Sequence, residues 1–264
     1  MNQDQVKEKL LAIEDAPLDF SLIFSGKKSK KVNGLYKPET KEIVIHNRNF
    51  SDDNLLLYTA IHEYAHHLHA CAQGGKLSAR AHTSEFWAIL HGLLEKAETR
   101  NIYQNVFASS PELTALTETI RTKHLAENGA IVKDLGEKLL LAQKLCEKIG
   151  GRFEDYVDRV LRIPRLAVAT AIKMHQYNVN PSVGSDNMRF LAGIKDEDVR
   201  VAAESALLGG KTPDTVKVAV QSQKTPPAEE YPRVKLEKEK ARLERTLDSI
   251  KKRLDEITQE LEQC

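Results

Sequence analysis

Residues 62–66 read His-Glu-Tyr-Ala-His, so two histidines stand four positions apart with a glutamate directly after the first. The surrounding stretch begins with a Ser-Asp pair at 51–52, carries apolar residues at intervals and ends at Gly74-Gly75, which is typical of one helix. Residues four apart on a helix lie on the same face, one turn above the other. Both imidazoles can therefore reach one Zn²⁺ at about 2.0–2.1 Å, and the spacing predicts a metal site on this helix.

A catalytic zinc needs a third protein ligand and an open fourth position. His69 follows the motif on the same helix, where it would crowd one face, and His91 lies within the next predicted helix, where we expect a packed or surface role. His82 stands just before "TSEFW", at the start of that second helix, where a returning chain can bring its ring to the metal. We expect His82 as the third ligand, with Glu85 as the alternative.

Glu63 lies next to the first histidine of the pair, where its carboxylate can take a proton from a water that the zinc has acidified. This arrangement predicts hydrolysis of an amide bond, with Glu63 as the base. Tyr36 and Tyr64 are both candidate donors to the oxyanion that forms, and the sequence does not choose between them. His67 and His69 are expected at the surface or behind the ligands, with no assigned role.

The pair of motifs "HEYAH" and "HTSEFW" resembles the H-E-x-x-H … H-S-x-x-F-W signature of the SprT-like and YgjP-like zinc metallopeptidases. The resemblance covers roughly residues 15–100. It implies a compact zincin domain, in which a small sheet packs on the active-site helix and three histidines hold the zinc. The residues that match are the ligands His62, His66 and His82, the base Glu63, and Phe86 and Trp87 as core anchors beneath the site.

Two features depart from this signature. Thr83 stands where the family usually has Ser or Gly, and the stretch between the second and third histidine ligands includes a longer insertion, "LSARAH". Neither departure removes a ligand, so both concern the geometry of the connecting loop. No glycine-bearing second histidine motif of the metzincin kind follows.

The chain has 264 residues, enough for two domains of ordinary size. Its three cysteines are scattered, which argues against a disulfide framework and against a cysteine-rich structural zinc cluster. No apolar run reaches the ~18 residues of a membrane span, and residues 1–20 lack the apolar block of a signal peptide. We therefore expect a cytoplasmic protein with no membrane partner. The net charge of +1 gives no overall case for nucleic acid, so any such case must come from a local patch.

Strand-like runs are confined to residues 17–46, where "LDFSLIFS" and "LYKPETKEIVIH" flank the basic loop "GKKSKKVNG". A Pro-Glu-Thr-Lys segment inside the second run predicts a hairpin. From residue 111 to 210 we expect short amphipathic helices broken by "ENG", "IGG", "RIPR" and "NVNPSVGSDN". The predicted fold class is α+β, mostly α: a small zincin domain with a short β-sheet and the active-site helix, an all-α helix-turn-helix bundle, and a C-terminal coiled-coil helix.

Residues 153–177, "FEDYVDRVLRIPRLAVATAIKMHQY", have the pattern of a helix-turn-helix. Pro164 suits the first position of the second helix, which would enter the major groove of double-stranded DNA. The apolar residues expected to pack the two helices together are Val157, Val160, Leu161, Leu166, Val168 and Ile172. The residues expected to contact DNA are Arg159, Arg162, Arg165, Thr170 and Lys173.

With its flanking segments, this unit resembles the helical DNA-binding domain of ParB-like partition proteins, over roughly residues 130–210. The resemblance implies that double-stranded DNA is a partner. Arg162 departs from the pattern, because a turn glycine is common at this position. A helical bundle that only packs or binds protein is the alternative.

The C-terminal part has no further chemistry of its own. Residues 211–233 are expected to be a linker because they are mostly polar and have prolines near their end. Residues 234–264 are expected to form a coiled-coil helix. Lys240 is the polar position of the seam, and Cys264, at the next seam position, is expected to be an inert thiol. The apolar seam consists of Leu236, Leu243, Leu247, Ile250, Leu254, Ile257 and Leu261.

The sequence as a whole predicts a zinc metallopeptidase domain at 1–108, a helical ParB-like domain at 109–210, the linker at 211–233 and the coiled coil at 234–264. Attack of a zinc-activated water on a peptide carbonyl would cut a protein or peptide substrate, and the second domain suggests a substrate associated with DNA. The coiled coil can pair two chains in a homodimer or fold back on its own chain. The alternative is a non-enzymatic DNA-binding regulator or partition-type adaptor with a structural metal site.

Overall fold

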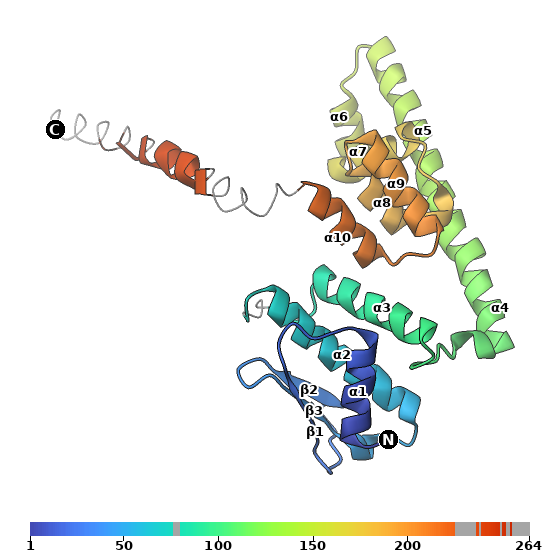
Figure 1. Ribbon diagram of the computed structural model, residues 1–264. Helices are drawn as coiled ribbons and strands as arrows, with labels where there is room; N and C mark the ends of the chain where they lie inside the picture. Colours follow the sequence, from blue (N-terminus) through green and yellow to red (C-terminus); the bar gives the residue numbers. More distant parts are fainter. Residues whose placement is uncertain (76–79, 225–235, 238, 249, 252–253, 255–264) are drawn as a thin grey trace. The chain divides into compact units, whose positions relative to one another are not determined.

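The computed structural model describes residues 1–75, 80–224, 236–237, 239–248, 250–251 and 254 (Figure 1). The chain falls into two units, residues 1–218 and residues 219–264. The first unit contains a small sheet with three helices, followed by a long series of helices. The described part is therefore mostly helical with one small sheet, as the sequence predicts.

A three-stranded sheet organises the N-terminal part. β1 (Ser21–Phe24) is parallel to β3 (Glu42–Ile45), and β2 (Gly34–Lys37) pairs antiparallel with the other side of β3, so the order is β1-β3-β2. The predicted hairpin joins β2 to β3, and Lys41 in its turn has a left-handed φ of 54°. β2 is an edge strand, so one side of its backbone has no strand partner in this sheet.

Three helices pack with the sheet: α1 (Gln3–Ile13), α2 (Asp53–Ala72) and α3 (Ser84–Thr99). α2 contacts both β2 and β3 on one side and α3 on the other, so it is the central layer of this part (Figure 1). Ile43 and Ile45 of the central strand are fully buried in the resulting core. The helix that carries the histidine motif is thus fixed from two sides.

α1 is a helix that the sequence analysis did not predict. Val6, Leu10 and Ile13 recur at helical spacing and are buried in the same core. Asn2 and Gln5 form a capping box, in which each side chain accepts a hydrogen bond from the other residue's backbone N–H.

The ends of α2 and α3 lie where the sequence predicts them. Asp52 accepts a hydrogen bond from the Leu55 N–H at 2.9 Å, and Thr83 accepts one from the Phe86 N–H at 3.3 Å. These are ordinary N-caps, so Thr83 supplies a role that Ser would also supply. Gly74 follows α2 with a left-handed φ of 66°, which ends the helix.

The helical part follows η2 (Phe107–Ser109). Its elements are α4 (Pro111–Thr119), η3 (Ile120–Ala126), α5 (Glu127–Lys148), α6 (Phe153–Asp155), η4 (Tyr156–Leu161), α7 (Arg165–Gln176), η5 (Pro181–Val183), α8 (Ser185–Ala192), α9 (Glu197–Leu208) and α10 (Pro213–Lys224). The helices α5 and α7 pack against each other and share a small core that includes Leu139, Val168 and Ala171.

The prediction that "ENG" breaks the helices is wrong, because α4, η3 and α5 follow one another without interruption from 111 to 148. Gly129 in this stretch serves packing: a Cβ atom there would lie 2.6 Å from the Pro181 carbonyl oxygen. The glycine therefore lets η5 approach the helix. The break at "IGG" is confirmed, since Gly150 has a left-handed φ of 71° after α5.

The helix-turn-helix pattern is present in outline, with a helical stretch at 153–161, a connection at 162–164 and α7. Val157 and Val168 are buried between the helices as expected, but Val160 is 66% and Leu166 80% exposed, so the prediction that these two pack inside is wrong. Residues 156–161 are π-helical, and the wider turn changes which side chains face inward. Arg162 has a left-handed φ of 56°, the conformation for which a glycine is common.

The segment expected to be a linker is helical at its start, because α10 covers Pro213–Lys224, and residues 225–233 lie outside the described residues. In the second unit the described residues between 236 and 254 are helical, and the described seam residues Leu236, Leu243, Leu247, Ile250 and Leu254 are exposed. Ile257, Leu261 and Cys264 lie outside the described residues. No helix in the part that the structure describes is long and apolar enough to cross a membrane.

Candidate metal centre

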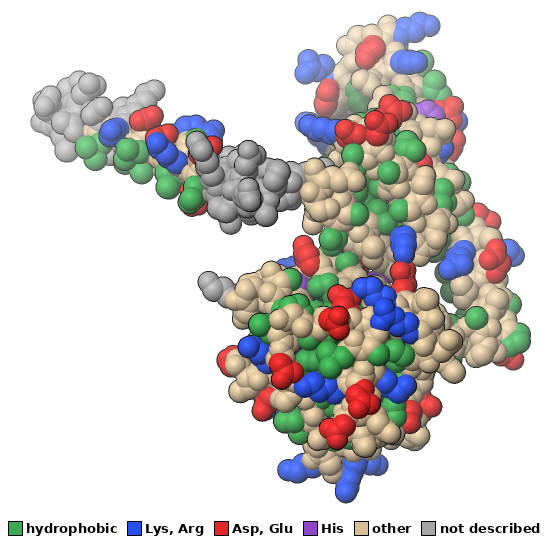
Figure 2. Space-filling view, viewed as in Figure 1, with side chains coloured by type: hydrophobic (Ala, Val, Ile, Leu, Met, Phe, Trp, Pro, Cys, Tyr) green, Lys and Arg blue, Asp and Glu red, His purple; other side chains and the backbone are tan. Residues whose placement is uncertain are grey.

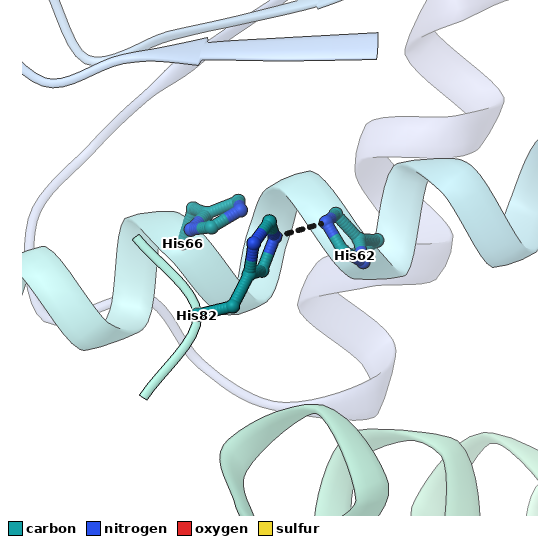
Figure 3. Close-up of side chains that lie close together, drawn as sticks. All are labelled: His62, His66 and His82. Carbon is teal, nitrogen blue, oxygen red and sulfur yellow. Dashed lines mark hydrogen bonds between the residues drawn. The ribbon is translucent and has the colours of Figure 1, made fainter. Parts of the chain in front are cut away.

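Three histidines from two elements converge above α2 (Figure 3). His62 and His66 lie one turn apart on α2, and His82 reaches them from the chain just before α3. One ring nitrogen of each histidine lies within 4.8 Å of the other two, and Nε2 of His62 is 3.1 Å from Nε2 of His82. The three residues are therefore close enough to bind a metal ion.

The donor set fits a tetrahedral zinc with one open position. Zn–N distances of about 2.0–2.1 Å place two ligand nitrogens about 3.3 Å apart in a tetrahedral site. The 3.1 Å between Nε2 of His62 and Nε2 of His82 is close to this value. The other nitrogen separations are at most 4.8 Å, so small side-chain movements would bring them to it. Without a metal, one of the two facing Nε2 atoms must carry a proton, because the pair can form a hydrogen bond only as donor and acceptor.

Two aromatic rings at the start of α3 hold the imidazoles. The Phe86 ring, fully buried, stacks on His66 with ring centroids 4.2 Å apart. The Trp87 ring stacks on His82 with centroids 5.5 Å apart at an interplanar angle of 27°. Both rings were expected to anchor the core beneath the site. Phe86 does so, because it is fully buried in the core, whereas Trp87 is only half-buried against it.

Glu63 faces the free edge of the sheet. Glu63 is 7% exposed, and its carboxylate lies near the backbone N–H of Tyr36 on β2. Burial raises the pKa of Glu63 to about 7, and the Tyr36 N–H opposes part of that rise because it favours the charged form. A carboxyl group with a pKa near neutrality can both accept and return a proton at ordinary pH.

Gly34 makes the close approach of β2 and α2 possible. A Cβ atom at this position would lie 2.8 Å from Glu63 Cγ and 2.9 Å from both Glu63 Oε1 and Thr59 Cγ2. All three distances are shorter than ordinary contacts, so a side chain here would displace Glu63. Sequence reasoning missed this residue, because a single glycine in a short strand gives no sign of what lies beside it.

Burial also prepares the two helix histidines for a metal. Burial, with a smaller contribution from the neighbouring histidines, lowers the pKa of His62 to about 4 and that of His66 to about 3. Metal ligation requires the neutral imidazole. At neutral pH both rings are therefore already in the form that binds a metal.

A cavity of about 430 Å³ opens over these residues. Metal-binding and catalytic candidates form one wall, and β2 with the chain before it forms another. Its described lining residues are Val32, Asn33, Gly34, Leu35, Tyr36, Tyr58, Thr59, His62, Glu63, His66, Ala81 and His82. The chamber can hold several residues of a polypeptide beside the histidines.

The other candidate ligands lie outside the group of three. Glu85, the alternative third ligand, is exposed, and a hydrogen bond with Thr83 lowers its pKa, so it belongs to the cap of α3. His69 is buried, with one ring nitrogen 2.9 Å from the Gln73 amide nitrogen and Nδ1 without a partner among the described atoms. His91 lies 2.9 Å from the Thr212 hydroxyl, which agrees with a packed role.

His67 and His69 were expected at the surface or behind the ligands, and the surface is excluded because they are 0% and 2% exposed. His67 Nε2 donates to the Leu18 carbonyl at 2.9 Å, and this fixes Nδ1 as the acceptor for the Tyr36 hydroxyl at 3.1 Å. The Tyr64 hydroxyl donates to the Glu14 carbonyl at 2.7 Å. Both tyrosine hydroxyls are thus engaged within the fold, and neither is free to serve as an oxyanion donor in this arrangement.

The five expected DNA contacts fall into two groups. Arg159 donates two hydrogen bonds of 2.6 Å to Asp155, Arg165 is paired with Asp158, and the Thr170 hydroxyl donates to a backbone carbonyl of its own helix. Arg162 and Lys173 are exposed and have no described side-chain partner. The local aspartates therefore neutralise two of the four positive charges expected to face DNA.

No family model, no curated protein and no solved structure matches the chain.

Proposed function

We propose that this protein is a zinc-dependent metallopeptidase. The observation that carries the proposal is the convergence of His62, His66 and His82 beside the buried Glu63 in one cavity. A zinc held by three histidines supplies a Lewis acid that acidifies a water and polarises a carbonyl. This donor set, rather than four protein ligands, is typical of catalytic sites.

Glu63 is the proposed base and then acid. Its carboxylate lies directly after the first ligand on the same helix, and a pKa near 7 suits removal of a proton from the attacking water and its return to the leaving amine. On the strand side, Gly34 of β2 lies directly against the Glu63 side chain. The carboxylate is thereby fixed before substrate arrives, which lowers the cost of reaching the reactive geometry.

The free edge of β2 favours a polypeptide as the substrate. An edge strand can pair with an extended chain through backbone hydrogen bonds. Gly34, Leu35 and Tyr36 of this strand line the same cavity as the histidines. An extended peptide along β2 would therefore present a backbone carbonyl to the metal centre.

Metal analysis and three single variants test this proposal. The wild-type protein should bind about one zinc per chain, and His82→Ala should lose most of it. Glu63→Gln should keep zinc and folding and lose cleavage of unfolded casein, a general protease substrate. Glu85→Gln is the matched control and should keep both zinc and cleavage. Cleavage that persists in Glu63→Gln would show that Glu63 is not the base. Zinc that persists in His82→Ala would show that His82 is not the third ligand.

The second candidate is a DNA-binding function of the helical part, which we propose on the observed helix, short turn and helix at 153–176. Arg162 and Lys173 are its free cations. If the function is present, binding of duplex DNA should weaken steeply with salt, because phosphate contacts release counterions. The double variant Arg162→Ala with Lys173→Ala should bind duplex DNA more weakly than the wild-type chain. If the wild-type chain does not bind DNA even at low salt, DNA is not a partner and the proposal of a DNA-associated substrate is wrong.

The homodimer is a further proposal. The exposed seam residues from Leu236 to Leu254 are what supports it, because an apolar helix stripe of this spacing is usually covered by another helix. Sedimentation of the full chain should give a dimer mass, and Leu243→Glu with Leu247→Glu should give the monomer. A monomer mass for the wild-type chain would favour a helix that folds back.

A further inference from the structure

A basic loop adjoins the metal centre and is not used by the proposed chemistry. Residues 25–33 connect β1 to β2 and include Lys27, Lys28, Lys30 and Lys31, all exposed and none with a described side-chain partner. Arg48 of the neighbouring η1 (Asn47–Asn49) is exposed as well. The loop forms the lower end of the N-terminal part in Figure 1, where Lys and Arg side chains gather in Figure 2. We refer to residues 25–33 as the lysine loop.

The backbone of the lysine loop is fixed by side chains of η1. Asn49 accepts a hydrogen bond from the Ser29 N–H at 2.9 Å and donates to the Ser29 carbonyl and to Asn33 Oδ1, both at 2.8 Å. Asn47 accepts from the Gly26 N–H at 3.0 Å. These bonds involve no lysine side chain, so the four ammonium groups project from a backbone that is already ordered.

The lysine loop leads directly into the wall of the metal cavity. Val32 and Asn33 line that cavity, and Gly34 lies against Glu63. Two residues lie between Lys31 and Gly34, and the three steps of chain from one to the other span at most about 10 Å. A peptide that extends two to four residues away from the metal centre covers a similar distance at about 3.3 Å per residue. Its side chains would then lie within reach of the lysines.

We propose that the lysine loop binds acidic side chains of the polypeptide substrate, so that this peptidase favours Asp and Glu two to four residues from the scissile bond. This inference rests on the proposed function. Next to the bond itself the cavity is apolar, because Leu35 and Tyr58, 47% and 38% exposed, line it. The substrate class is therefore an extended segment with an apolar residue at the bond and acidic residues beyond it.

Nucleic acid is the other polyanion that four lysines could bind, and the surroundings favour it less. Proteins that bind single strands combine basic grooves with exposed aromatic rings on which bases stack. The aromatic residues nearest in sequence are Phe24, which is half-buried, and Tyr36, which is buried, and the lysine loop itself carries no ring. Duplex readers place a helix or a strand pair in a groove, whereas these lysines lie on a connection that borders the peptide cavity.

Cleavage-site mapping tests the inference. The zinc-loaded full chain is incubated with a proteome-derived peptide library, and the cut positions are read by mass spectrometry. Asp and Glu should be enriched two to four residues from the bond. Lys30→Glu with Lys31→Glu should abolish that enrichment, while Lys144→Glu with Lys148→Glu, the same charge change on exposed positions of α5, should leave it unchanged. Cleavage without acidic enrichment, or enrichment that survives Lys30→Glu with Lys31→Glu, overturns the inference and leaves the peptidase intact.

If no cleavage is seen, the proposed function is contradicted, but the binding of acidic peptides can still be tested. A binding measurement does this. Fluorescence anisotropy with zinc-loaded Glu63→Gln follows a labelled peptide that has a central Leu and flanking Glu residues. Binding should be at least about tenfold tighter than for the same peptide with Gln in place of Glu, and raised salt should remove the difference. Equal binding of the two peptides, or tighter binding of a duplex DNA that Lys30→Glu with Lys31→Glu abolishes, overturns the inference.

Discussion

Replacement of Gly34 by alanine probes the contact on which the proposed base depends. Gly34 is not among the residues with positive φ, so an alanine can adopt its backbone conformation without strain. What the site lacks is space, because the new Cβ would lie 2.8 Å from Glu63 Cγ and 2.9 Å from Thr59 Cγ2. Ordinary carbon contacts begin about 0.6 Å further out. Glu63 and Thr59 sit on successive turns of α2, so β2 and α2 must separate or Glu63 must rotate.

The expected effects on stability and on catalysis differ in size. Overpacking of this kind costs about 1–3 kcal/mol of unfolding free energy. A reacting group displaced by about 1 Å can lose about 100-fold in rate, and the displaced group here is the proposed base. The three atoms nearest to the added methyl group belong to Glu63 and Thr59 and not to a proposed zinc ligand, so zinc content should stay near the wild-type level. Gly34→Ala should therefore lower kcat far more than it lowers zinc occupancy.

Urea unfolding, zinc content and peptide cleavage of the same preparation measure these three quantities. Gly92→Ala is the matched control, because a Cβ there meets nothing within 4 Å and alanine suits the interior of α3. Thr59→Ser in the Gly34→Ala background removes the Thr59 methyl group and should recover part of the stability. Wild-type cleavage rates in Gly34→Ala would refute the reasoning, since they would mean that Glu63 tolerates the displacement or is not the base.

Three further outcomes follow from burial at the site. Because the pKa values of His62 and His66 lie near 4 and 3 in the folded state, both rings gain protons on unfolding below pH 6.5. The metal-free protein should lose up to about 1.4 kcal/mol of stability per ring for each pH unit between 6.5 and about 4, and His66→Gln should make this urea-measured loss shallower. Phe86→Ala should cost about 3–5 kcal/mol in thermal unfolding, against under about 0.5 kcal/mol for the exposed Phe107→Ala. His67→Phe leaves the buried Tyr36 hydroxyl without its acceptor and should cost about 1–3 kcal/mol; unchanged stability would show that His67 has no structural role.

The metal site was largely predictable because its rules are local. The spacing of His62 and His66 is set by the helical repeat, and the cap at Thr83 with the following Phe-Trp pair indicates where the chain returns. The strand side of the site was not predictable in the same way. Gly34 and Tyr36 reach Glu63 only because the sheet packs on α2, and no local pattern specifies that pairing.

The helix-turn-helix prediction failed at Val160 because the helical repeat changes there. The apolar pattern was projected with 3.6 residues per turn, whereas residues 156–161 are π-helical and turn more slowly. From the buried Val157, the next inward position falls nearer Leu161 than Val160, and the accessibilities follow this order. A sequence pattern cannot report such a change of repeat, so Val160 was assigned to the wrong face of the first helix, while Val157 and Val168 were assigned correctly.

The sequence could have decided between the two positions expected for His67, at the surface or behind the ligands. Leu57, Ala60, Tyr64 and Cys71 mark the inward stripe of α2 at helical spacing, and position 67 belongs to the same stripe. Inside the core, the ring accepts the hydroxyl hydrogen of Tyr36 and so ties β2 to α2. The backbone N–H of that same tyrosine lies near the Glu63 carboxylate and lowers its pKa. One histidine of the helix that binds no metal therefore fixes the strand against which the proposed base is aligned, and loosening it should reduce catalysis before it reduces zinc binding.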